Sequence, residues 1–499
     1  MAKNIILIFT DQQRFDSIEA LGNPIIKTPN LNRLVEKGVA FTRAYTPCPV
    51  CIPARYAMHT GIMPCVSDCV MNETMPDGNR SFMEILSEHD YQTHGAGKMH
   101  FEFEGENPDF LWGYEKRDVS EECVLSDDYT AFLKENGYDH VHDPHGVRSE
   151  MYYIPQPSQV PARLHNSSWV VDKSIDFLDH RDVARPFMLM TSFIKPHPPF
   201  ESPTPWNKLY RGPEMPLPKR PQDSEDLLTY WNKVQNRYKY KDHGTDDHLA
   251  RAIKAAYYGA ISFIDYNLGR LLDYLELHEM FDDTLIVFAS DHGELLGDYY
   301  SYGKRTLLDS ASRIPLVMVH PDLPGGTRCS TPVSLVDIMP TFLDAANIER
   351  SEALDGESLV DLCTGTKKRE GVYSQYQRDE YGMYMMATEK YKYIYSAPDQ
   401  KEWLFDLTID PEETHNRAHN PMFIHQTKIM RESLISFLTA NGSADMVEGK
   451  MFKRYPKKEL PTDPDALLLF QDPPASLPHI AGYERSSVYT EINIFGRSK

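Results

Sequence analysis

Two continuous apolar runs that end in aspartate constrain the fold of this 499-residue chain more than any other feature. NIILIFTD (4–11) ends on Asp11, and TLIVFASD (284–291) ends on Asp291. A strand buried on both faces reads as an unbroken apolar run, and such strands are typical of parallel sheets covered by helices. Ligands bind beyond the carboxyl ends of the strands in these sheets. We therefore expect the two aspartates to meet at one edge of a large sheet.

Helical patterns alternate with further apolar runs in the N-terminal part of the chain. TPNLNRLVEKG (28–38) predicts a helix that begins after Thr28 and ends before Gly38. VAFTRAYT (39–46) predicts the next strand, and residues 248–279 predict a long amphipathic helix. This alternation indicates an α/β fold, with a large, mostly parallel mixed sheet flanked by helices.

The pattern changes after about residue 365. Residues 381–396 are rich in tyrosine and read as two strands about a polar turn, and residues 423–440 predict a helix. These features indicate a smaller C-terminal α+β domain with an antiparallel sheet and a helix. The expected divisions are a catalytic α/β domain, this smaller domain and an extended C-terminal tail, at residues 1–365, 366–440 and 441–499.

Charge and composition exclude several classes of protein. The formal net charge is −21, which disfavours binding to nucleic acid or anionic membranes because phosphate arrays require clustered Lys and Arg. No run approaches the roughly 18 apolar residues of a membrane helix. MAKNIILIFTDQQRFD, at the start of the chain, does not read as a secretory signal. We therefore expect a cytoplasmic protein without a disulfide framework.

The residues next to the two aspartates suggest a metal site. Gln12 follows Asp11, and His292 follows Asp291, so carboxylate, amide and imidazole ligands are available together. Oxygen ligands select Ca²⁺, Mg²⁺ or Mn²⁺, and an imidazole shifts the preference slightly toward Mn²⁺. The alternative is that the strand-end acids cap neighbouring helices.

A group of four cysteines gives a competing interpretation. Their spacing, C-x2-C-x13-C-x3-C, is close to that of a structural zinc site, and CPVC (48–51) also matches a redox pair. A non-catalytic protein held together by zinc would follow from that arrangement. The four residues are Cys48, Cys51, Cys65 and Cys69.

The residues after Cys51 favour a different role for it. Pro53 begins the helical pattern PARYAMHT, and Gly61 follows its end. Cys51 then lies at a helix N-terminus, where free N–H groups and the helix dipole attract anions. Arg55 is one turn along and can reach the same point. Neither a zinc site nor a redox pair requires this arginine.

The same residues carry a family resemblance. CIPARYAMHTG (51–61) resembles the formylglycine signature of the sulfatases, C-x-P-[SA]-R followed by T-G. Further motifs occur in the order of that family, from residue 4 to about residue 421. They are IFTDQQ, GAGKMHF (95–101), SFIKPHPPF (192–200), SDHGE (290–294), Lys304 and WLFDLTIDPEETHN (403–416).

The resemblance implies a reaction and a set of residues. In the family the cysteine is oxidised to an aldehyde, and its hydrate attacks the sulfur of a sulfate monoester, so that sulfate and an alcohol are released. A divalent cation, with Ca²⁺ expected first and Mn²⁺ or Mg²⁺ as alternatives, binds near the modified cysteine. The implied metal ligands are Asp11, Gln12, Asp291, His292 and Cys51. The implied catalytic residues are Cys51, Arg55, Lys98, His100, His197 and Lys304, with Asn72, Lys98 and Lys304 contacting the substrate.

Some positions depart from the common family pattern. Gln12 and His292 stand where many members have Asp and Asn, and both choices resemble the branch that contains choline sulfatase and the phosphonate monoester hydrolases. GKMHF (97–101) is similar to choline sulfatase in particular. Ile62 stands where an arginine often follows T-G. These differences leave the substrate open, so a phosphonate or phosphate mono- or diester hydrolase is the nearest alternative to a sulfatase.

The resemblance and the expected location also imply partners. A cytoplasmic enzyme would act on a small sulfated substrate, and its cysteine would be oxidised by a formylglycine-generating enzyme or an anaerobic sulfatase-maturating enzyme. Tail residues such as Tyr483 and Arg485 are candidates for contacts in a homo-oligomer. Three other features are expected to be structural: His59 as a packed residue, Cys65 and Cys69 as buried or idle thiols, and the tyrosines of 381–395 as core and hairpin pairs.

Overall fold

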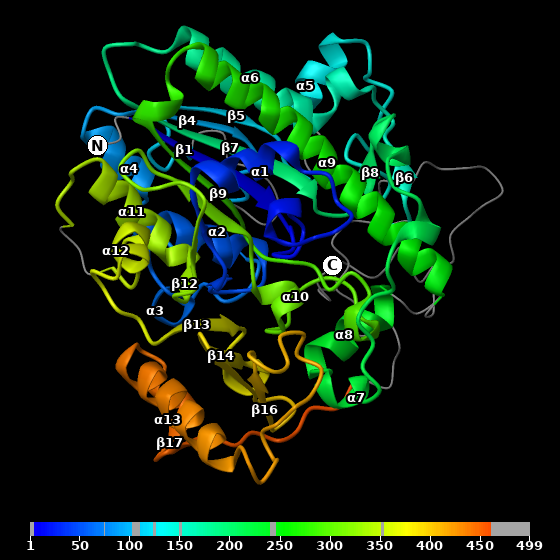
Figure 1. Ribbon diagram of the computed structural model, residues 1–499, viewed down its shortest axis with the longest axis vertical. Coiled ribbons are helices and arrows are strands. Elements are labelled where there is room, and N and C mark those ends of the chain that lie inside the picture. The colour runs from blue at the N-terminus through cyan, green and yellow to red at the C-terminus, as the bar shows by residue number, and fades with distance from the viewer. Residues whose placement is uncertain are drawn as a thin grey trace, which may run out of the picture.

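An eight-stranded sheet with the order β11-β2-β10-β9-β1-β7-β4-β5 forms the centre of the computed structural model (Figure 1). All its neighbouring strands are parallel except the pairs that involve β10, so the expected large, mostly parallel mixed sheet is confirmed. The strands are β1 (Asn4–Asp11), β2 (Val39–Phe41), β4 (Gln92–Gly97), β5 (Lys116–Val119), β7 (Phe187–Pro196), β9 (Thr284–Ser290), β10 (Leu316–Val319) and β11 (Thr327–Cys329). The structure describes residues 4–73, 75–101, 110–122, 126–148, 152–239, 246–350 and 354–460.

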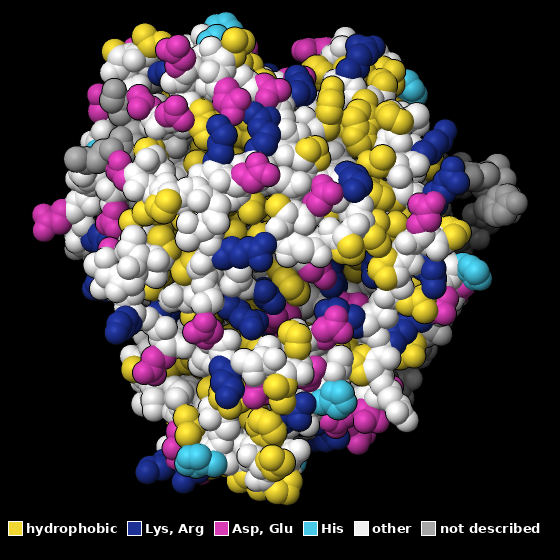
Figure 2. Space-filling model, viewed as in Figure 1, with side chains coloured by type: hydrophobic (Ala, Val, Ile, Leu, Met, Phe, Trp, Pro, Cys, Tyr) yellow, Lys and Arg dark blue, Asp and Glu magenta, His cyan; other side chains and the backbone are white. Residues whose placement is uncertain are grey.

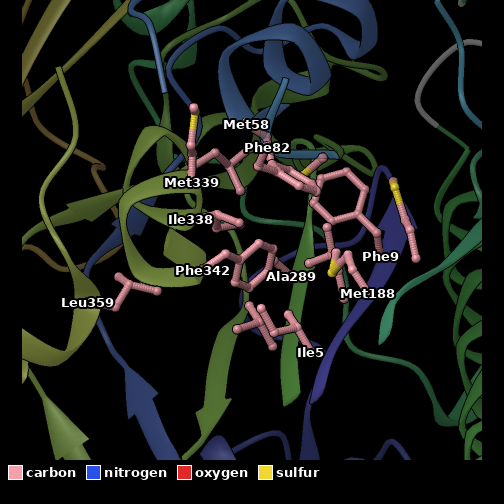
Figure 3. Close-up of a cluster of buried hydrophobic side chains, with 14 of the residues drawn as sticks. Ile5, Phe9, Met58, Phe82, Met188, Ala289, Ile338, Met339, Phe342 and Leu359 are labelled. Carbon is pink, nitrogen blue, oxygen red and sulfur yellow. The ribbon is translucent and has the colours of Figure 1, made fainter. Parts of the chain in front are cut away.

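Helices cover both faces of this sheet. Successive side chains of a strand point to opposite faces, and β1 shows this directly: Ile5 packs into one apolar cluster and Ile6 into the other. The first cluster joins the sheet to α2, α4, α11 and α12, and Figure 3 shows part of it, with Phe82 and Phe342 edge to face. The second cluster joins the sheet to α1, α6 and α9. The continuous apolar runs of the sequence thus become strands that are buried on both sides.

The helices agree closely with the sequence patterns. The predicted helix after Thr28 is α1, and the predicted helix at 248–279 is α9. Thr28 is the N-cap by position, but its side chain does not cap the helix; the Asp265 carboxylate accepts the free N–H groups of Asn30 and Leu31 instead. The helices are α1 (Pro29–Lys37), α2 (Cys51–Thr60), α3 (Pro64–Ser67), α4 (Phe82–Glu88), α5 (Asp128–Glu135), α6 (Asn166–His180), α7 (Ser224–Leu227), α8 (Tyr230–Lys239), α9 (Asp247–Leu277), α10 (Asp309–Ser312), α11 (Ile338–Ala345), α12 (Leu359–Thr364) and α13 (Ile424–Ala440).

One predicted strand is split in two. Residues 39–46 form β2, a turn, and then β3 (Ala44–Tyr45), which leaves the main sheet and pairs with β12 (Val333–Ser334). The Thr42 N–H donates to the Cys329 carbonyl, and the Arg43 carbonyl accepts the Val333 N–H, so neither group pairs with β10. The split directs the chain toward α2, whose first residue is Cys51.

The expected antiparallel sheet with a helix is present at the C-terminal side. Four strands pair in sequence order, and α13 packs on the middle two, below the main sheet in Figure 1. The tyrosine-rich segment supplies the central hairpin, and one further strand, which the sequence analysis does not predict, pairs on each side of it. The strands are β13 (Gly371–Tyr376), β14 (Met383–Thr388), β15 (Tyr391–Ser396) and β16 (Lys401–Asp406).

A buried ion pair network joins the C-terminal sheet to the main sheet. Lys392 of β15 is fully buried, and its Nζ atom lies 2.7 Å from Asp309 Oδ1 and 2.8 Å from Glu413 Oε1. Asp309 begins α10, and the Gly293 N–H donates to the Ala311 carbonyl of the same helix. The C-terminal sheet therefore supports the loop that follows β9.

Residues 441–460 pack against the C-terminal sheet. They contain the hairpin of β17 (Val447–Glu448) and β18 (Met451–Phe452), and the Phe452 ring stacks on Tyr395 at 3.9 Å between centroids. Residues 461–499, with Tyr483 and Arg485, lie outside the described residues, so the proposed role of the tail in oligomerisation stays a prediction.

The surface mixes charges of both signs. On the face shown in Figure 2, Asp and Glu side chains are interspersed with Lys and Arg, so the net charge of −21 is not gathered into one acidic field there. Among the helices in the described part of the chain, none combines the length and the apolar character needed to cross a membrane.

Candidate active site

The carboxyl ends of the two neighbouring strands β1 and β9 place Asp11 and Asp291 side by side. Both side chains are fully buried. Gln12 takes a left-handed backbone conformation, with φ of 65°, and its N–H donates to Asp291 Oδ1 at 2.9 Å. This hydrogen bond ties the end of one strand to the end of the other. The expectation that the strand-end acids meet at one edge of the sheet is confirmed.

Cys51 is the first residue of α2, so it lies at the helix N-terminus as expected, although the sequence pattern predicted that the helix begins at Pro53. The N-cap residue Val50 is extended and offers no side-chain cap, so the first N–H groups are available to other partners. One of them, the Ile52 N–H, donates to Asn72 Oδ1 at 3.1 Å. The helix ends at Gly61, whose φ of 67° is the left-handed conformation that glycine adopts easily. Every residue of α2 is buried, so the helix N-terminus is held rigidly in the site.

The thiol of Cys51 points into the cluster of charged residues. Its Sγ atom lies 3.9 Å from Asp11 Oδ1, 3.2 Å from His292 Nε2 and 2.9 Å from Lys304 Nζ. The Lys304 ammonium also donates to Gln12 Oε1 at 2.9 Å. Residues from the start and from the second half of the chain therefore meet at this sulfur.

The donor atoms at this point fit a divalent cation. The ligand atoms of Asp11, Cys51, Asp291 and His292 lie within 4.8 Å of one another, and all four residues are buried. His292 Nδ1 lies 3.0 Å from the Gly293 carbonyl, which keeps a proton on Nδ1 and leaves Nε2 as the ligand atom. Carboxylate oxygens with one imidazole suit Ca²⁺, Mn²⁺ or Mg²⁺.

The orientation of the Gln12 amide is determined by a second buried carboxylate. Its Nε2 atom donates to Glu294, which is fully buried and also accepts the N–H groups of Leu296 and Gly303. The amide oxygen of Gln12 therefore faces Lys304 and the cluster. The amide oxygen of Gln12 can therefore serve as a metal ligand without the negative charge that a carboxylate would add.

Arg55, one turn along α2, holds the two strand-end carboxylates in place. It is fully buried, and its Nε lies 3.2 Å from Asp291 Oδ2 while its Nη2 lies 3.3 Å from Asp11 Oδ2. Its Nη1 donates to the Lys98 carbonyl at 3.0 Å and to Ser192 Oγ at 3.1 Å. The guanidinium thus links α2 to four strands of the main sheet, β1, β4, β7 and β9, or to the residue that directly follows them.

Burial and neighbouring charges shift the pKa values of Asp291 and of the Cys51 thiol. Burial, and next the charge of Asp11, raise the pKa of Asp291 to about 6. Burial and Asp11 also act to raise the pKa of the Cys51 thiol, but Lys304, Lys98 and a histidine outweigh them and lower it to about 6. A divalent cation between the carboxylates would remove their mutual repulsion, because it offers each of them an opposite charge.

Lys98 and His197 meet at a carboxylate that the sequence did not single out. The Lys98 ammonium lies 2.6 Å from Asp11 Oδ2 and also contacts Glu122. His197 Nδ1 lies 3.2 Å from Glu122 Oε2, and Arg148 Nη2 lies 2.9 Å from the same oxygen. Glu122 stands in a polar segment between β5 and α5 with no motif or periodicity around it, so nothing in the sequence distinguishes it.

His100 lies at the same edge but has fewer contacts. Its backbone N–H and that of Met99 both donate to Glu121 Oε1 at 2.7 Å, which holds the turn after β4. Its φ is 56°, and its Nδ1 atom is buried without a hydrogen-bond partner among the described residues. Burial, followed by the charge of Lys98, lowers the pKa of His100 well below its ordinary value. The ring is thus held neutral beside the charged cluster.

The four-cysteine zinc site does not form. Cys51 groups with two aspartates and a histidine, and the metal-binding groups of the described residues contain no other thiol. Cys48 Sγ donates to the Val70 carbonyl at 3.6 Å, Cys69 is buried and Cys65 is half-buried. The thiol of Cys51 is instead directed toward the strand ends, next to Asp11 and His292.

The residues that the sequence assigned to the core are placed there. His59 stacks on Phe82 and Trp112, and its ring nitrogens contact the Arg55 carbonyl and the Tyr114 hydroxyl. The tyrosines of the central C-terminal hairpin are also mostly buried: Tyr384, Tyr393 and Tyr395.

Comparison with known proteins agrees with the geometry of the site. Residues 3–348 match the family described as Sulfatase, and residues 297–439 match the family described as N-sulphoglucosamine sulphohydrolase, C-terminal. An arylsulfatase of Clostridium perfringens (strain 13 / Type A) is 29% identical over 489 residues, which cover 92% of this chain and 99% of that protein. A choline-sulfatase of Rhizobium meliloti (strain 1021) is 29% identical over 440 residues, covering 84% and 83%. The phosphonate monoester hydrolase of Agrobacterium radiobacter has the same fold, with a TM-score of 0.77, 24% identity and coverage of 88% and 96%.

Proposed function

This chain belongs to the sulfatase family and is a sulfatase, and we propose that it hydrolyses a sulfate monoester through a formylglycine derived from Cys51. The products are inorganic sulfate and an alcohol. The observation that carries the proposal is the position of Cys51 Sγ. It lies at the N-terminus of α2 and within 3.2 Å of His292 Nε2 and 2.9 Å of Lys304 Nζ.

The chemistry of the reaction explains why the nucleophile is a modified side chain and not an unmodified one. A hydrated aldehyde at Cys51 and a bound divalent cation together supply an oxygen nucleophile at neutral pH and a route for releasing sulfate from the enzyme. The cation would be held by Asp11, Gln12, Asp291 and His292, beside the modified residue. Ca²⁺ is the expected ion, with Mn²⁺ and Mg²⁺ as alternatives.

The basic residues of the site bind and orient the anionic group. Arg55 holds the two carboxylates and the first turn of α2, so it orients the modified side chain. Lys98 and Lys304 place ammonium groups beside Asp11 and Cys51, where they neutralise the oxygens of a bound sulfate. Asn72 accepts the Ile52 N–H through its oxygen, which leaves its amide nitrogen for the substrate.

Two histidines supply the proton transfers. His197 and Lys98 both contact Glu122, and His197 is the acid for the leaving oxygen. His100 follows Lys98 on the same turn, is neutral because of burial and nearby cations, and is the base for the second step. Such proton transfers contribute about 100- to 10,000-fold to rate.

Mass spectrometry of the peptide that contains Cys51, combined with an aryl sulfate assay, tests the proposal. The expected result is an aldehyde in place of the thiol, with activity proportional to the modified fraction across preparations. Full activity in a preparation that contains only the unmodified thiol would overturn it.

A phosphonate or phosphate mono- or diester hydrolase on the same frame is the second candidate. The fold shared with a phosphonate monoester hydrolase favours it, and both groups are tetrahedral and anionic. The kcat/KM values for an aryl sulfate and for a phosphonate monoester, measured on one preparation, decide between them. A higher value for the phosphonate would favour the second candidate.

The proposed chemistry also implies partners and a location. Oxidation of Cys51 requires a formylglycine-generating enzyme or an anaerobic sulfatase-maturating enzyme. A cytoplasmic location would suit a small sulfated substrate better than an intact polysaccharide. Coexpression with each maturation enzyme, followed by measurement of the aldehyde fraction, identifies which one acts on this chain.

A further inference from the structure

Glu122 occupies a position between Lys98, Arg148 and His197 at the edge of the site. It follows β5, and only 10% of its side chain is exposed. A buried carboxylate is costly unless it is paired, and this one is paired on both oxygens. Its Oε1 contacts Lys98 Nζ, while its Oε2 lies 2.9 Å from Arg148 Nη2 and 3.2 Å from His197 Nδ1.

The contacts of His197 determine which ring nitrogen carries the exchangeable proton. Nδ1 lies 2.7 Å from the Pro198 carbonyl oxygen and 3.2 Å from Glu122 Oε2, and both of these atoms accept hydrogen bonds. A proton therefore stays on Nδ1, and Nε2 is the atom that gains or gives one. Nε2 has one hydrogen-bond contact among the described residues, a long one to the Tyr152 hydroxyl at 3.5 Å.

The cations around His197 oppose the charged imidazolium that an acid catalyst requires. Burial, followed by Lys304 and then Lys98, lowers the pKa of His197 well below its ordinary value. Asp11 acts in the opposite direction, but it is already paired with Lys98 and Arg55. Among the described residues, Glu122 is the carboxylate within hydrogen-bond distance of this imidazole.

We propose that Glu122 is a positioning residue of the hydrolysis, which orients His197 and stabilises its charged form while it protonates the leaving oxygen. This inference rests on the proposed function. As the S–O bond to the alcohol breaks, its electron pair stays on the leaving oxygen, which takes the proton from His197 Nε2. The nucleophilic hydroxyl of the hydrated aldehyde at position 51 forms the new bond to sulfur and loses its proton, which replaces the one that His197 gave to the alcohol. In the second step the remaining hydroxyl gives its proton to His100 as the C–O bond to sulfate breaks, and water then adds to the aldehyde to restore the hydrate.

The dependence of rate on the leaving group tests this role. An acid matters most when the departing oxygen is strongly basic, so phenyl sulfate needs it more than 4-nitrophenyl sulfate does. Glu122→Gln keeps the size of the side chain and removes its charge. It should lower kcat/KM by about 100-fold for phenyl sulfate and by less than about 10-fold for 4-nitrophenyl sulfate, after correction for the modified fraction.

A double mutant distinguishes a role of Glu122 through His197 from a role in holding Lys98 for sulfate binding. If Glu122 acts through His197, the double variant E122Q/H197A is no slower on phenyl sulfate than His197→Ala alone. Equal losses on both esters, or additive losses in the double variant, would overturn the inference, because either result would show that Glu122 acts through sulfate binding.

Glu402→Gln is the matched control, because Glu402 is also a partly buried carboxylate paired with an arginine, Arg431, but belongs to the C-terminal sheet. It should leave the ratio of the two kcat/KM values unchanged, and a similar change of ratio in this control would overturn the inference. Circular dichroism verifies that each variant is folded. Wild-type protein that is fully modified yet inactive on both esters would refute the proposed function itself, whereas active wild-type protein with an unselective E122Q variant refutes only this inference.

Discussion

The Nε2 atom of His292 lies 3.2 Å from the Sγ atom of Cys51, across a separation of 241 positions in the chain. This contact joins the end of β9 to the start of α2. It places a proposed metal ligand beside the residue that would become the nucleophile. A redox pair or a four-thiol zinc site would instead have turned Cys51 toward Cys48.

Replacing Cys51 should abolish hydrolysis while Cys48 should be dispensable. Cys51→Ala removes the proposed nucleophile, and we expect aryl sulfate kcat/KM to fall by more than about 10,000-fold. Cys48→Ala is the matched control, because Cys48 is equally buried and its thiol donates to the Val70 carbonyl. Comparable activity losses in both variants, with folding intact, would contradict the assignment of Cys51.

Removing the divalent cation should lower both activity and thermal stability. Asp11 and Asp291 would then face each other in a buried site. An ion at about 100 times its Kd stabilises the folded state by about 2.7 kcal/mol, so Tm should rise with the concentration of added ion. Thermal unfolding after chelation, with Ca²⁺, Mn²⁺ or Mg²⁺ added back separately, gives the order of preference. A Tm that is independent of all three ions would argue against this site, and Asp291→Asn should abolish the response.

The buried Lys392 should be essential for the attachment of the C-terminal sheet. Lys392→Met leaves Asp309 and Glu413 facing each other without a cation, which should lower the free energy of unfolding by about 3–5 kcal/mol. Lys390→Met is the control, because Lys390 is exposed on the neighbouring turn and should have an effect of less than about 0.5 kcal/mol. Urea denaturation measures both values, and similar losses in the two variants would refute this role.

His59 should make the protein less stable in acid. Burial lowers the pKa of His59 from 6.5 to about 3. Between these values the unfolded chain binds a proton that the folded protein does not, so stability is complete above about pH 6.5 and decreases as the pH falls. One such group contributes a slope of up to about 1.4 kcal/mol per pH unit.

Denaturation of His59→Gln across this range of pH measures the contribution. The variant should lose less stability than the wild type between about pH 7 and about pH 5, even if it is less stable at every pH. His180→Gln is the control, since 77% of the His180 side chain is exposed. An unchanged slope in the His59 variant would show that its protonation is not coupled to folding.

The strand ends and the helix start could be predicted because they depend on local patterns. Unbroken apolar runs indicated β1 and β9, and the aspartates that end them had to emerge at the same edge of a parallel sheet. Pro53 and Gly61 indicated the helix that begins near Cys51. The proximity of Asp11 and Asp291 then followed from how parallel sheets are built.

Other parts of the site could not be read from neighbouring residues. Glu122 lies in a loop without periodicity. Glu294 is the last residue of the SDHGE motif, but the motif does not show which way its carboxylate points. The split of residues 39–46 into β2 and β3 depends on hydrogen bonds to chain that is distant in sequence. These features depend on long-range packing, for which a single sequence carries no local signal.

The sequence by itself determined the fold class, the edge where the acids meet and the helix that presents Cys51, because hydrophobic periodicity and helix-terminal residues act over a few positions. Only the tertiary structure decided how the groups near that cysteine contact one another, and that Glu122 is among them. Two lysines, one arginine, three histidines and the buried carboxylate of Glu122 lie at this edge because strands and loops far apart in the chain end at the same edge of one sheet.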